Sequence, residues 1–177
     1  MSWELEFLLW LQHIFSADWL KTCMILITLL GNAGLIWLAI IGYVGVVKKE
    51  KRQAIVLLAG LVLVAVIGNL IIKNIFMRSR PFEIYLYVDL LIKAPKDFSF
   101  PSGHTSTSFV VATILGYYYP KQRKYVFLLA SLIALSRMVL FVHFPTDILV
   151  GLVLGLASGY FMIMLDQNGW FSKWLKF

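Results

Sequence analysis

The chain has 177 residues, of which 60% are hydrophobic and 14% charged, and its formal net charge is +7. A soluble domain is closer to half apolar and a quarter charged, so this composition excludes a disordered chain, a coiled coil, a collagen-like fibre and a typical soluble enzyme. It indicates one integral membrane domain, 1–177. The basic residues lie between apolar runs rather than in one soluble patch, which argues against nucleic-acid binding. The single cysteine, Cys23, allows no intrachain disulfide.

The first segment, 1–19, is predicted to lie on the membrane surface. It carries acids, Glu4 and Glu6, where a cleaved signal peptide needs positive charge. Its apolar side chains recur at roughly helical spacing, at Trp3, Phe7, Trp10, Leu11 and Ile14. This pattern is typical of an amphipathic interfacial helix, and a short buried span is the alternative.

Five apolar runs follow, each near the ~20 residues that a helix needs to cross a hydrocarbon core about 30 Å thick. They are 24–47, 54–76, 103–119, 125–142 and 147–165. Because the runs are continuous and do not alternate, they predict helices and not barrel strands. The expected fold is an all-α integral membrane bundle of five to six transmembrane helices, with an N-terminal interfacial helix.

Glycines in the last run predict how that helix packs. Gly151, Gly155 and Gly159 are spaced by four and therefore share one helix face. Small residues on one face let two helix backbones approach closely, so we expect this face to pack against a neighbouring helix.

Basic loops predict the orientation in the membrane. With five spans, three basic regions share one side: 48–52, 121–124, and the C-terminal Lys173 and Lys176. The positive-inside rule makes that side cytoplasmic, which puts the N-terminus, the loop 77–102 and the turn at 143–146 outside. The long loop is also basic, which conflicts with the rule unless its charges have a function; they are Arg78, Arg80, Lys93 and Lys96.

Three polar clusters interrupt the apolar pattern, and the topology places all of them at the outer membrane surface. They are 73–81, 101–104 and 136–147. Ionisable residues in or beside a span are costly and functional by default. Three cations in these clusters would attract a polyanion, and guanidinium groups suit phosphate oxygens. These cations are Lys73, Arg80 and Arg137.

The same clusters hold residues suited to phosphate chemistry. Ser102 and Gly103 open a predicted helix, where a hydroxyl, free N–H groups and the helix dipole favour an anion. His104 and His143 can each act as nucleophile, acid or base. Asp147 follows His143 by four residues, and if Pro145 opens a helix, this carboxylate can reach back to the imidazole. It would then fix the tautomer and make the other ring nitrogen a better nucleophile.

Each residue also has a structural interpretation. Lys73 and Arg78, taken singly, would extend to the interface, and Arg137 would form an ion pair with Asp147. Three asparagines are expected to make interhelical hydrogen bonds: Asn32, Asn69 and Asn74. Three acids are expected to be solvated loop charges: Glu83, Asp89 and Asp97.

Taken together, the clusters resemble the three-part signature of the type 2 phosphatidic acid phosphatase (PAP2) superfamily, in its bacterial membrane branch. The resemblance covers roughly 20–165, with all three parts complete and in order. The parts are Lys73, six residues, Arg80-Pro81; Pro101-Ser102-Gly103-His104; and Ser136-Arg137, five residues, His143, three residues, Asp147. Larger relatives have six spans, whereas this chain has five predicted spans and an interfacial segment.

The resemblance implies a role for each residue. It implies that His143 attacks phosphorus to form a phosphohistidine, and that Asp147 orients and activates His143. His104 would protonate the leaving oxygen and then activate water. Five residues would hold the phosphoryl oxygens: Lys73, Arg80, Ser102, Gly103 and Arg137. No metal and no cofactor are implied, and the site region lacks the clustered carboxylates that Mg²⁺ or Mn²⁺ prefers.

The expected protein is therefore a lipid phosphatase of the cell membrane whose site faces the extracytoplasmic side. Undecaprenyl diphosphate and phosphatidylglycerol phosphate are equally favoured as substrates. A phosphatidic acid or lipid A phosphatase of the same mechanism is an alternative. A transporter of phosphorylated lipids would need polar residues along a whole path, and a non-catalytic lipid-binding scaffold would be expected to lack a motif residue. The expected partners are the lipid phosphate substrate and membrane lipids, with no nucleic acid.

Overall fold

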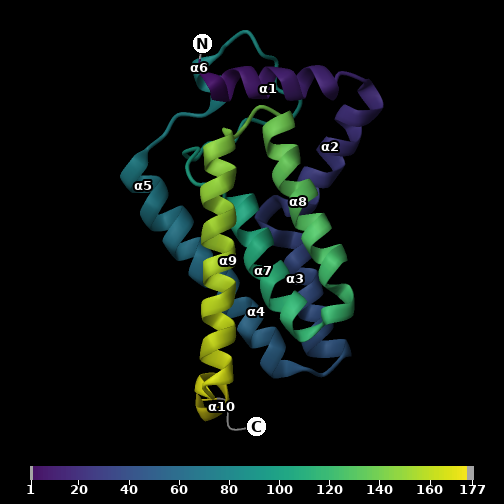
Figure 1. Ribbon diagram of the computed structural model, residues 1–177, viewed down its shortest axis with the longest axis vertical. Coiled ribbons are helices and arrows are strands. Elements are labelled where there is room, and N and C mark those ends of the chain that lie inside the picture. Colours follow the sequence, from purple (N-terminus) through teal and green to yellow (C-terminus); the bar gives the residue numbers. More distant parts are fainter. Residues whose placement is uncertain (1, 175–177) are drawn as a thin grey trace.

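A computed structural model of the chain describes residues 2–174, and every regular element in that range is helical. Figure 1 shows long helices that run along one axis, with α1 (Trp3–Ile14) lying across one end. The all-α arrangement predicted from the continuous apolar runs is confirmed for the described residues. The ends of the predicted domain, residue 1 and residues 175–177 with Lys176, lie outside the described residues.

Nine further helices follow α1 in the described part of the chain. They are α2 (Asp18–Gly31), α3 (Leu35–Gly42), α4 (Lys51–Val64), α5 (Lys73–Phe76), α6 (Pro81–Ile84), α7 (Gly103–Tyr118), α8 (Arg123–Val139), α9 (Pro145–Gln167) and α10 (Trp170–Trp174). Two π-helical segments extend α3 and join α4 to α5: Tyr43–Val47 and Ala65–Ile72.

The apolar run 24–47, predicted as one helix, is interrupted. A short 3₁₀ turn, Asn32–Gly34, separates α2 from α3. Gly34 has φ +67°, a left-handed conformation that glycine adopts without the steric cost of a Cβ. The interruption matters for function because Asn32 and Gly34 face the pocket described below.

Helix α1 turns away from the bundle axis, since α1 and α2 are bent by 116° relative to each other. One face of α1 is buried, and there Leu5 and Leu8 pack against Phe141 and Phe144. The opposite face exposes Trp3 and Trp10. Of the apolar residues singled out by their spacing in the sequence, Leu11 is buried, whereas the other four are exposed: Trp3, Phe7, Trp10 and Ile14.

The predicted glycine face of α9 packs against α7, as expected. A Cβ at Gly151 would lie 2.8 Å from the carbonyl oxygen of Ser102, and one at Gly155 would lie 2.7 Å from that of Ser106. At Gly159 it would lie 2.6 Å from Cβ of Thr113. The two backbones therefore approach too closely for any larger residue, and this approach holds the start of α7 beside the start of α9.

Two helical segments are long and apolar enough to cross a membrane by themselves: Lys51–Ile84 and Pro145–Gln167. The bent pair of α1 and α2 would add a third, and Leu35–Val47 is a shorter apolar helix. Helices α7 and α8 have 16 and 17 residues, or about 24 to 26 Å of helix, which is less than the hydrocarbon thickness. Helix length and composition therefore identify two or three of the five to six spans expected.

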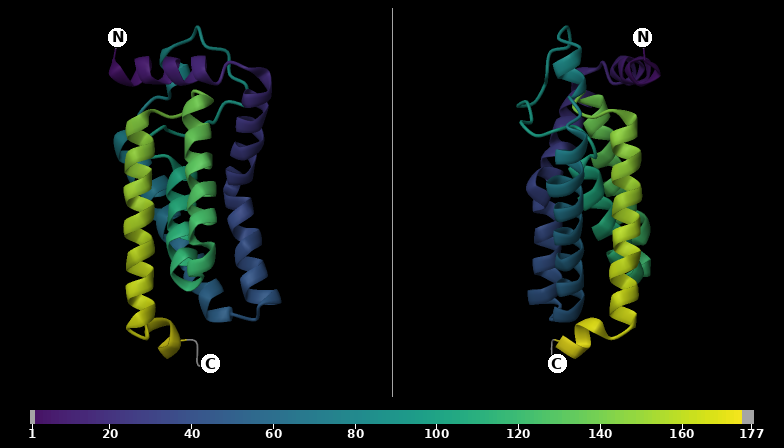
Figure 2. Two further views of the ribbon diagram at one scale, coloured as in Figure 1. Left: turned by 45° about the vertical axis from the view of Figure 1, so that its right-hand side comes forward. Right: turned by 90° about the vertical axis from the view of Figure 1, so that its left-hand side faces the viewer.

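Polar contacts tie the helices together at the end opposite α1. Arg52 at the start of α4 donates to Asp166 of α9 over 2.7 Å, and the hydroxyl of Tyr118 donates to the other carboxylate oxygen over 2.6 Å. Figure 2 shows the turn after α3 and the turn before α8 at this same end. The basic regions 48–52 and 121–124 therefore lie together, at the opposite end of the bundle from α1.

Candidate active site

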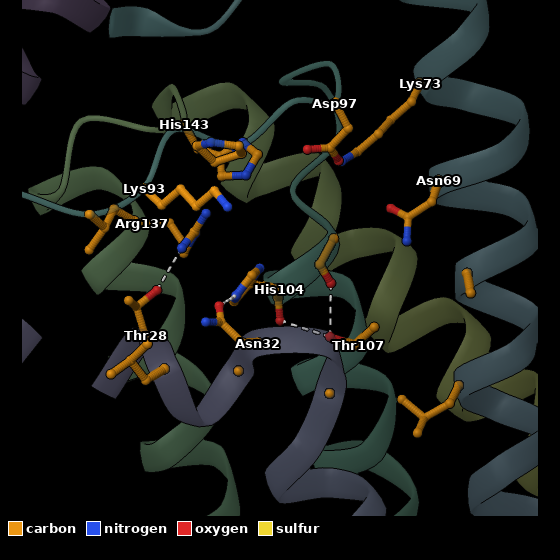
Figure 3. Close-up of a pocket in the computed structure, with 18 of the residues that line it drawn as sticks. Thr28, Asn32, Asn69, Lys73, Lys93, Asp97, His104, Thr107, Arg137 and His143 are labelled. Atoms are coloured by element: carbon orange, nitrogen blue, oxygen red, sulfur yellow. Dashed lines mark hydrogen bonds and ion pairs between the residues drawn. The ribbon is translucent and has the colours of Figure 1, made fainter. Parts of the chain in front are cut away.

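A pocket with a cavity volume of about 710 Å³ opens among α2, α4, α7, α8 and the loop 77–102. Six of the eight predicted site residues line it: Lys73, Arg80, Gly103, His104, Arg137 and His143. They come from the helix ends and loops that the sequence pattern singled out. Figure 3 labels four of them: Lys73, His104, Arg137 and His143. The other two, Ser102 and Asp147, are fully buried behind the pocket wall.

His143 is held by contacts at both ring nitrogens. Nη1 of Arg80 lies 3.2 Å from Nε2, and because a guanidinium only donates, Nε2 must be the unprotonated nitrogen. Nδ1 therefore carries the proton, and it lies 3.4 Å from both Oδ2 of Asp147 and Oγ of Ser99. The nitrogen with the free lone pair thus faces the cationic side of the pocket.

Asp147 occupies the first turn of α9, which begins at Pro145 as predicted. Its Oδ2 accepts hydrogen bonds from Oγ of Ser99 at 2.5 Å and from the backbone N–H of Phe144 at 2.8 Å. Its Oδ1 accepts one from Nη1 of Arg78 at 2.7 Å. The carboxylate is therefore fixed from three directions and directed toward His143.

Lys73 and Arg80 share one carboxylate, that of Asp97. Nη2 of Arg80 donates to Oδ1 of Asp97 over 2.8 Å, and Lys73 forms an ion pair with Oδ2. Partial burial raises the pKa of Asp97, but the contacts with Lys73 and Arg80 outweigh it and lower that pKa to about 2. Asp97 was expected to be a solvated loop charge; its side chain is 57% exposed, but it also pairs with both cations because the loop folds back over them.

Arg137 is a buried cation whose side chain makes one hydrogen bond within the described part of the chain. It is 3% exposed, and its Nη1 donates to the hydroxyl of Thr28 over 2.7 Å. Its Nε is buried and has no hydrogen-bond partner among the described residues. The structural alternative, an ion pair with Asp147, does not form, because Asp147 contacts Arg78 and His143 instead. Arg137 thus lines the pocket with hydrogen-bonding capacity unused.

His104 enters the pocket from the first turn of α7 (Figure 3). Its Nε2 is hydrogen-bonded to Oδ1 of Asn32 at 3.0 Å. Gly31 packs directly against the ring, since a Cβ there would lie 2.6 Å from Cδ2 of His104. Ser102 precedes this turn as the N-cap, and its hydroxyl accepts from Thr105 instead of lining the pocket.

The electrostatics of the pocket favour an anion. Among residues 2–174, four cations line it against one carboxylate, that of Asp97; the cations are Lys73, Arg80, Lys93 and Arg137. His143 lies in the loop before α9, where burial and the neighbouring charges of Arg80, Arg137 and Lys73 lower its pKa well below the ordinary value. His143 is therefore neutral, and its lone pair is available, at physiological pH.

The other end of the pocket is apolar. It is lined by four side chains of α3 and α4: Leu38, Leu58, Leu61 and Val62. Three of them are also exposed on the surface of the bundle, so this end opens between the two helices: Leu38, Leu58 and Val62. One cavity therefore joins a cationic chamber to an apolar groove.

Several residues at the site were missed or misread from the sequence. Ser99 was not considered, and Arg78 was read as a side chain extending to the interface, yet both contact Asp147. The conflict between the basic outer loop and the positive-inside rule did indicate that its cations have a function. Asn74 bonds to the carbonyl of Leu70 in its own helical segment and not to another helix. Glu83 caps α6 by accepting from the backbone N–H of Arg80 at 2.6 Å.

Comparison with known proteins identifies a family and relatives whose sequences match this chain. The sequence model described as the PAP2 superfamily matches residues 53–170, a range that contains all eight predicted site residues. An undecaprenyl-diphosphatase from Sulfolobus acidocaldarius is 27% identical over 139 residues, which cover 78% of this chain and 67% of that protein. Phosphatidylglycerophosphatase B from Bacillus subtilis is 32% identical over 125 residues, covering 62% of this chain and 59% of that protein.

A solved structure has the same architecture. The crystal structure of LpxE from Aquifex aeolicus matches with a TM-score of 0.79 at 26% sequence identity. The match covers 93% of this chain and 96% of that one, so the likeness extends over nearly the whole helical bundle.

Proposed function

This chain belongs to the PAP2 superfamily, and from that premise we propose that it hydrolyses the phosphate of an envelope lipid, undecaprenyl diphosphate or phosphatidylglycerol phosphate. Its class of activity is that of a membrane lipid phosphatase. The observation that carries the proposal is the single cavity, which joins four cations to an apolar groove. A phosphate head group fits the cationic chamber, while a prenyl or acyl tail leaves through the groove between α3 and α4.

The proposed reaction has two displacements at phosphorus. In the first, the lone pair of Nε2 of His143 attacks the phosphoryl group, the bond to the leaving oxygen breaks, and His104 supplies that oxygen with a proton. In the second, His104 takes a proton from water, and the hydroxide displaces His143 to release inorganic phosphate. Asp147 accepts the Nδ1 proton of His143 in a hydrogen bond and stabilises the positive charge of the phosphorylated ring.

The cations act on the charge of the transferring group. Lys73, Arg80 and Arg137 surround the place where three equatorial oxygens gain charge in the transition state. The first N–H groups of α7, at Gly103 and His104, have no partners within the helix and suit the same oxygens. In this proposal Ser102 contributes by capping α7, which holds those N–H groups in place.

We propose that five helical units cross the membrane, namely α2 with α3, α4 with α5, α7, α8 and α9, while α1 lies at the interface. The lipid-facing surface is supported by large exposed apolar residues along these units, among them Leu26, Leu128 and Val153. The basic turns at 48–52 and 121–124 then face the cytoplasm, and the pocket faces the extracytoplasmic side. The shorter α7 and α8 suit this arrangement because their outer ends meet the polar pocket instead of lipid.

Phosphate release by the purified, detergent-solubilised protein tests the proposed function. Undecaprenyl diphosphate, phosphatidylglycerol phosphate and phosphatidic acid would be compared in the presence of EDTA. We expect release from at least one of them that His143→Ala reduces by a factor of 10³ or more, on the order of the loss seen for a nucleophile. No release from any lipid phosphate, or full release by His143→Ala, would overturn the proposal.

Lys93 distinguishes a lipid diphosphate from a lipid with a single phosphate group, such as phosphatidic acid. It is an exposed loop residue that lines the pocket as the fourth cation, and a second phosphate group would need such a charge. If the substrate is a diphosphate, Lys93→Ala raises its KM several-fold more than the KM for a monophosphate lipid. Lys96→Ala is the matched control, because Lys96 is exposed on the same loop and does not line the pocket.

A further inference from the structure

Arg78 lies at the centre of a partly buried polar network that joins α1 to the start of α9. Its Nη1 donates to Oδ1 of Asp147 over 2.7 Å and to the hydroxyl of Thr146 over 2.6 Å. Its Nη2 donates to Oε2 of Glu4 over 2.6 Å. One guanidinium therefore connects Asp147 with an acid of the N-terminal helix, 74 residues before Arg78 in the sequence.

Glu4 is fixed as firmly as Arg78. Its side chain is 13% exposed, and its Oε1 accepts from the hydroxyl of Thr146 at 2.6 Å and from the backbone N–H of Thr146 at 3.3 Å. The guanidinium carbon of Arg78 lies 4.1 Å from the ring centre of Phe144, which also packs against α1. Glu4, Arg78 and the first turn of α9 thus form one packed unit.

This unit acts on His143 through Asp147 in two ways. Arg78 holds Oδ1 and so sets the rotation of the carboxylate, which leaves Oδ2 directed at Ser99, at the N–H of Phe144 and at Nδ1 of His143. Glu4 neutralises Arg78, so the three groups Glu4, Arg78 and Asp147 together keep one net negative charge. Without Glu4, the charge of Arg78 would offset that of Asp147 and weaken its stabilisation of a cationic imidazole.

We propose that Arg78 and Glu4 are positioning residues for the His143–Asp147 pair, and that α1 is thereby part of the active-site architecture. The inference rests on the proposed function, because it assigns them an effect on the nucleophile of that reaction. Neither residue lines the pocket, so neither is expected to contact substrate.

The test compares Arg78→Gln, Arg78→Lys and Glu4→Gln with Arg123→Gln, whose charge lies at the far end of the bundle. We expect Arg78→Gln to lower kcat by about 10- to 100-fold, in the range for removal of a group that orients a catalytic ligand, with KM changed less than threefold. Arg78→Lys should restore part of the loss. Glu4→Gln combined with Arg78→Gln should add little, because the two residues act through one contact.

The pH profile of kcat/KM provides a readout that a purely structural role would not change. Its acidic limb is the fall in kcat/KM at low pH, where His143 becomes protonated. His143 faces Asp147, Arg80, Arg137, Lys73 and His104, and the substitutions leave all five in place. Losing the positive charge of Arg78 favours a protonated His143, so the limb should move to higher pH. Losing the negative charge of Glu4 has the opposite effect, so the limb should move to lower pH.

The shifts of the acidic limb in the two variants either support or overturn the positioning role of Arg78 and Glu4. Opposite shifts of the limb, with normal thermal unfolding of Glu4→Gln, support it. An unmoved limb in both variants overturns it even if kcat falls, since α1 would then only stabilise the fold. If Arg78→Gln does not fold, Glu4→Gln decides alone. An inactive wild type and inactive Arg123→Gln would instead count against the proposed function.

Discussion

Nη1 of Arg80 lies 3.2 Å from Nε2 of His143, inside the cationic end of the pocket. The contact assigns the tautomer of His143, because the guanidinium can only donate. It also places a positive charge beside the imidazole, and burial together with this charge lowers the pKa of His143 well below its ordinary value. The proposed nucleophile is therefore kept neutral first by its burial and then by the charge of Arg80, which is also proposed to bind phosphate.

The first prediction concerns pH. A lowered pKa means that protonation removes the lone pair of His143 only in acid, so kcat/KM should stay level well below pH ~6.5, the ordinary imidazole value. Arg80→Gln removes the neighbouring charge and should move the acidic limb to higher pH, besides lowering the rate. An acidic limb at or above the ordinary imidazole value in the wild type would contradict this assignment.

The second prediction concerns Asp97, whose carboxylate forms ion pairs with both Lys73 and Arg80. Because its pKa is about 2, Asp97 stays ionised at any assay pH, and a phosphoryl group must compete with it. Asp97→Asn should therefore strengthen inhibition by inorganic phosphate or vanadate about three- to tenfold, as expected from removing one competing ion pair worth roughly 1 kcal/mol. Asp89→Asn, another exposed acid of this loop, is the control. Weaker inhibition in Asp97→Asn would mean that Asp97 aligns the cations instead of competing for them.

The third prediction concerns Gly31, which packs against the ring of His104. A Cβ at this position would lie 2.6 Å from Cδ2 of His104 and 2.9 Å from Cγ2 of Ile133, so the ring must move. Gly31→Ala should lower kcat by about 10²-fold, as expected for misplacing a proton donor by roughly 1 Å. Gly42→Ala is the matched control, since a Cβ at Gly42 meets nothing within 4 Å. Equal kcat for the two variants would show that the position of His104 is not critical.

The sequence predicted the parts of the site that depend on local signals. Pro145 marks the start of α9, Ser102 caps α7, and polar residues at helix ends are costly enough in a membrane protein to indicate function. Six of the eight residues predicted from these signals line one pocket in the structure. The glycine spacing of α9 likewise predicted its close approach to α7, because spacing by four defines one helix face.

The contacts made by the loop 77–102 were beyond the sequence pattern. Asp97 and Ser99 reach His143 and its neighbours only because the loop folds back over the pocket, and periodicity carries no information about the path of a loop. The contact between Glu4 and Arg78 spans 74 residues and depends on α1 turning across the bundle. The break at Asn32–Gly34 was also missed, because hydropathy is high on both sides of it.

The most direct test of the account is chemical trapping of the phosphorylated enzyme. The purified protein would be mixed with a lipid phosphate labelled at phosphorus, quenched in alkali within one turnover, and mapped by peptide mass spectrometry. The account predicts an acid-labile phosphoryl group on His143 that is absent from His143→Ala. Turnover with the label on a different residue, or hydrolysis at an undiminished rate by His143→Ala, would contradict it.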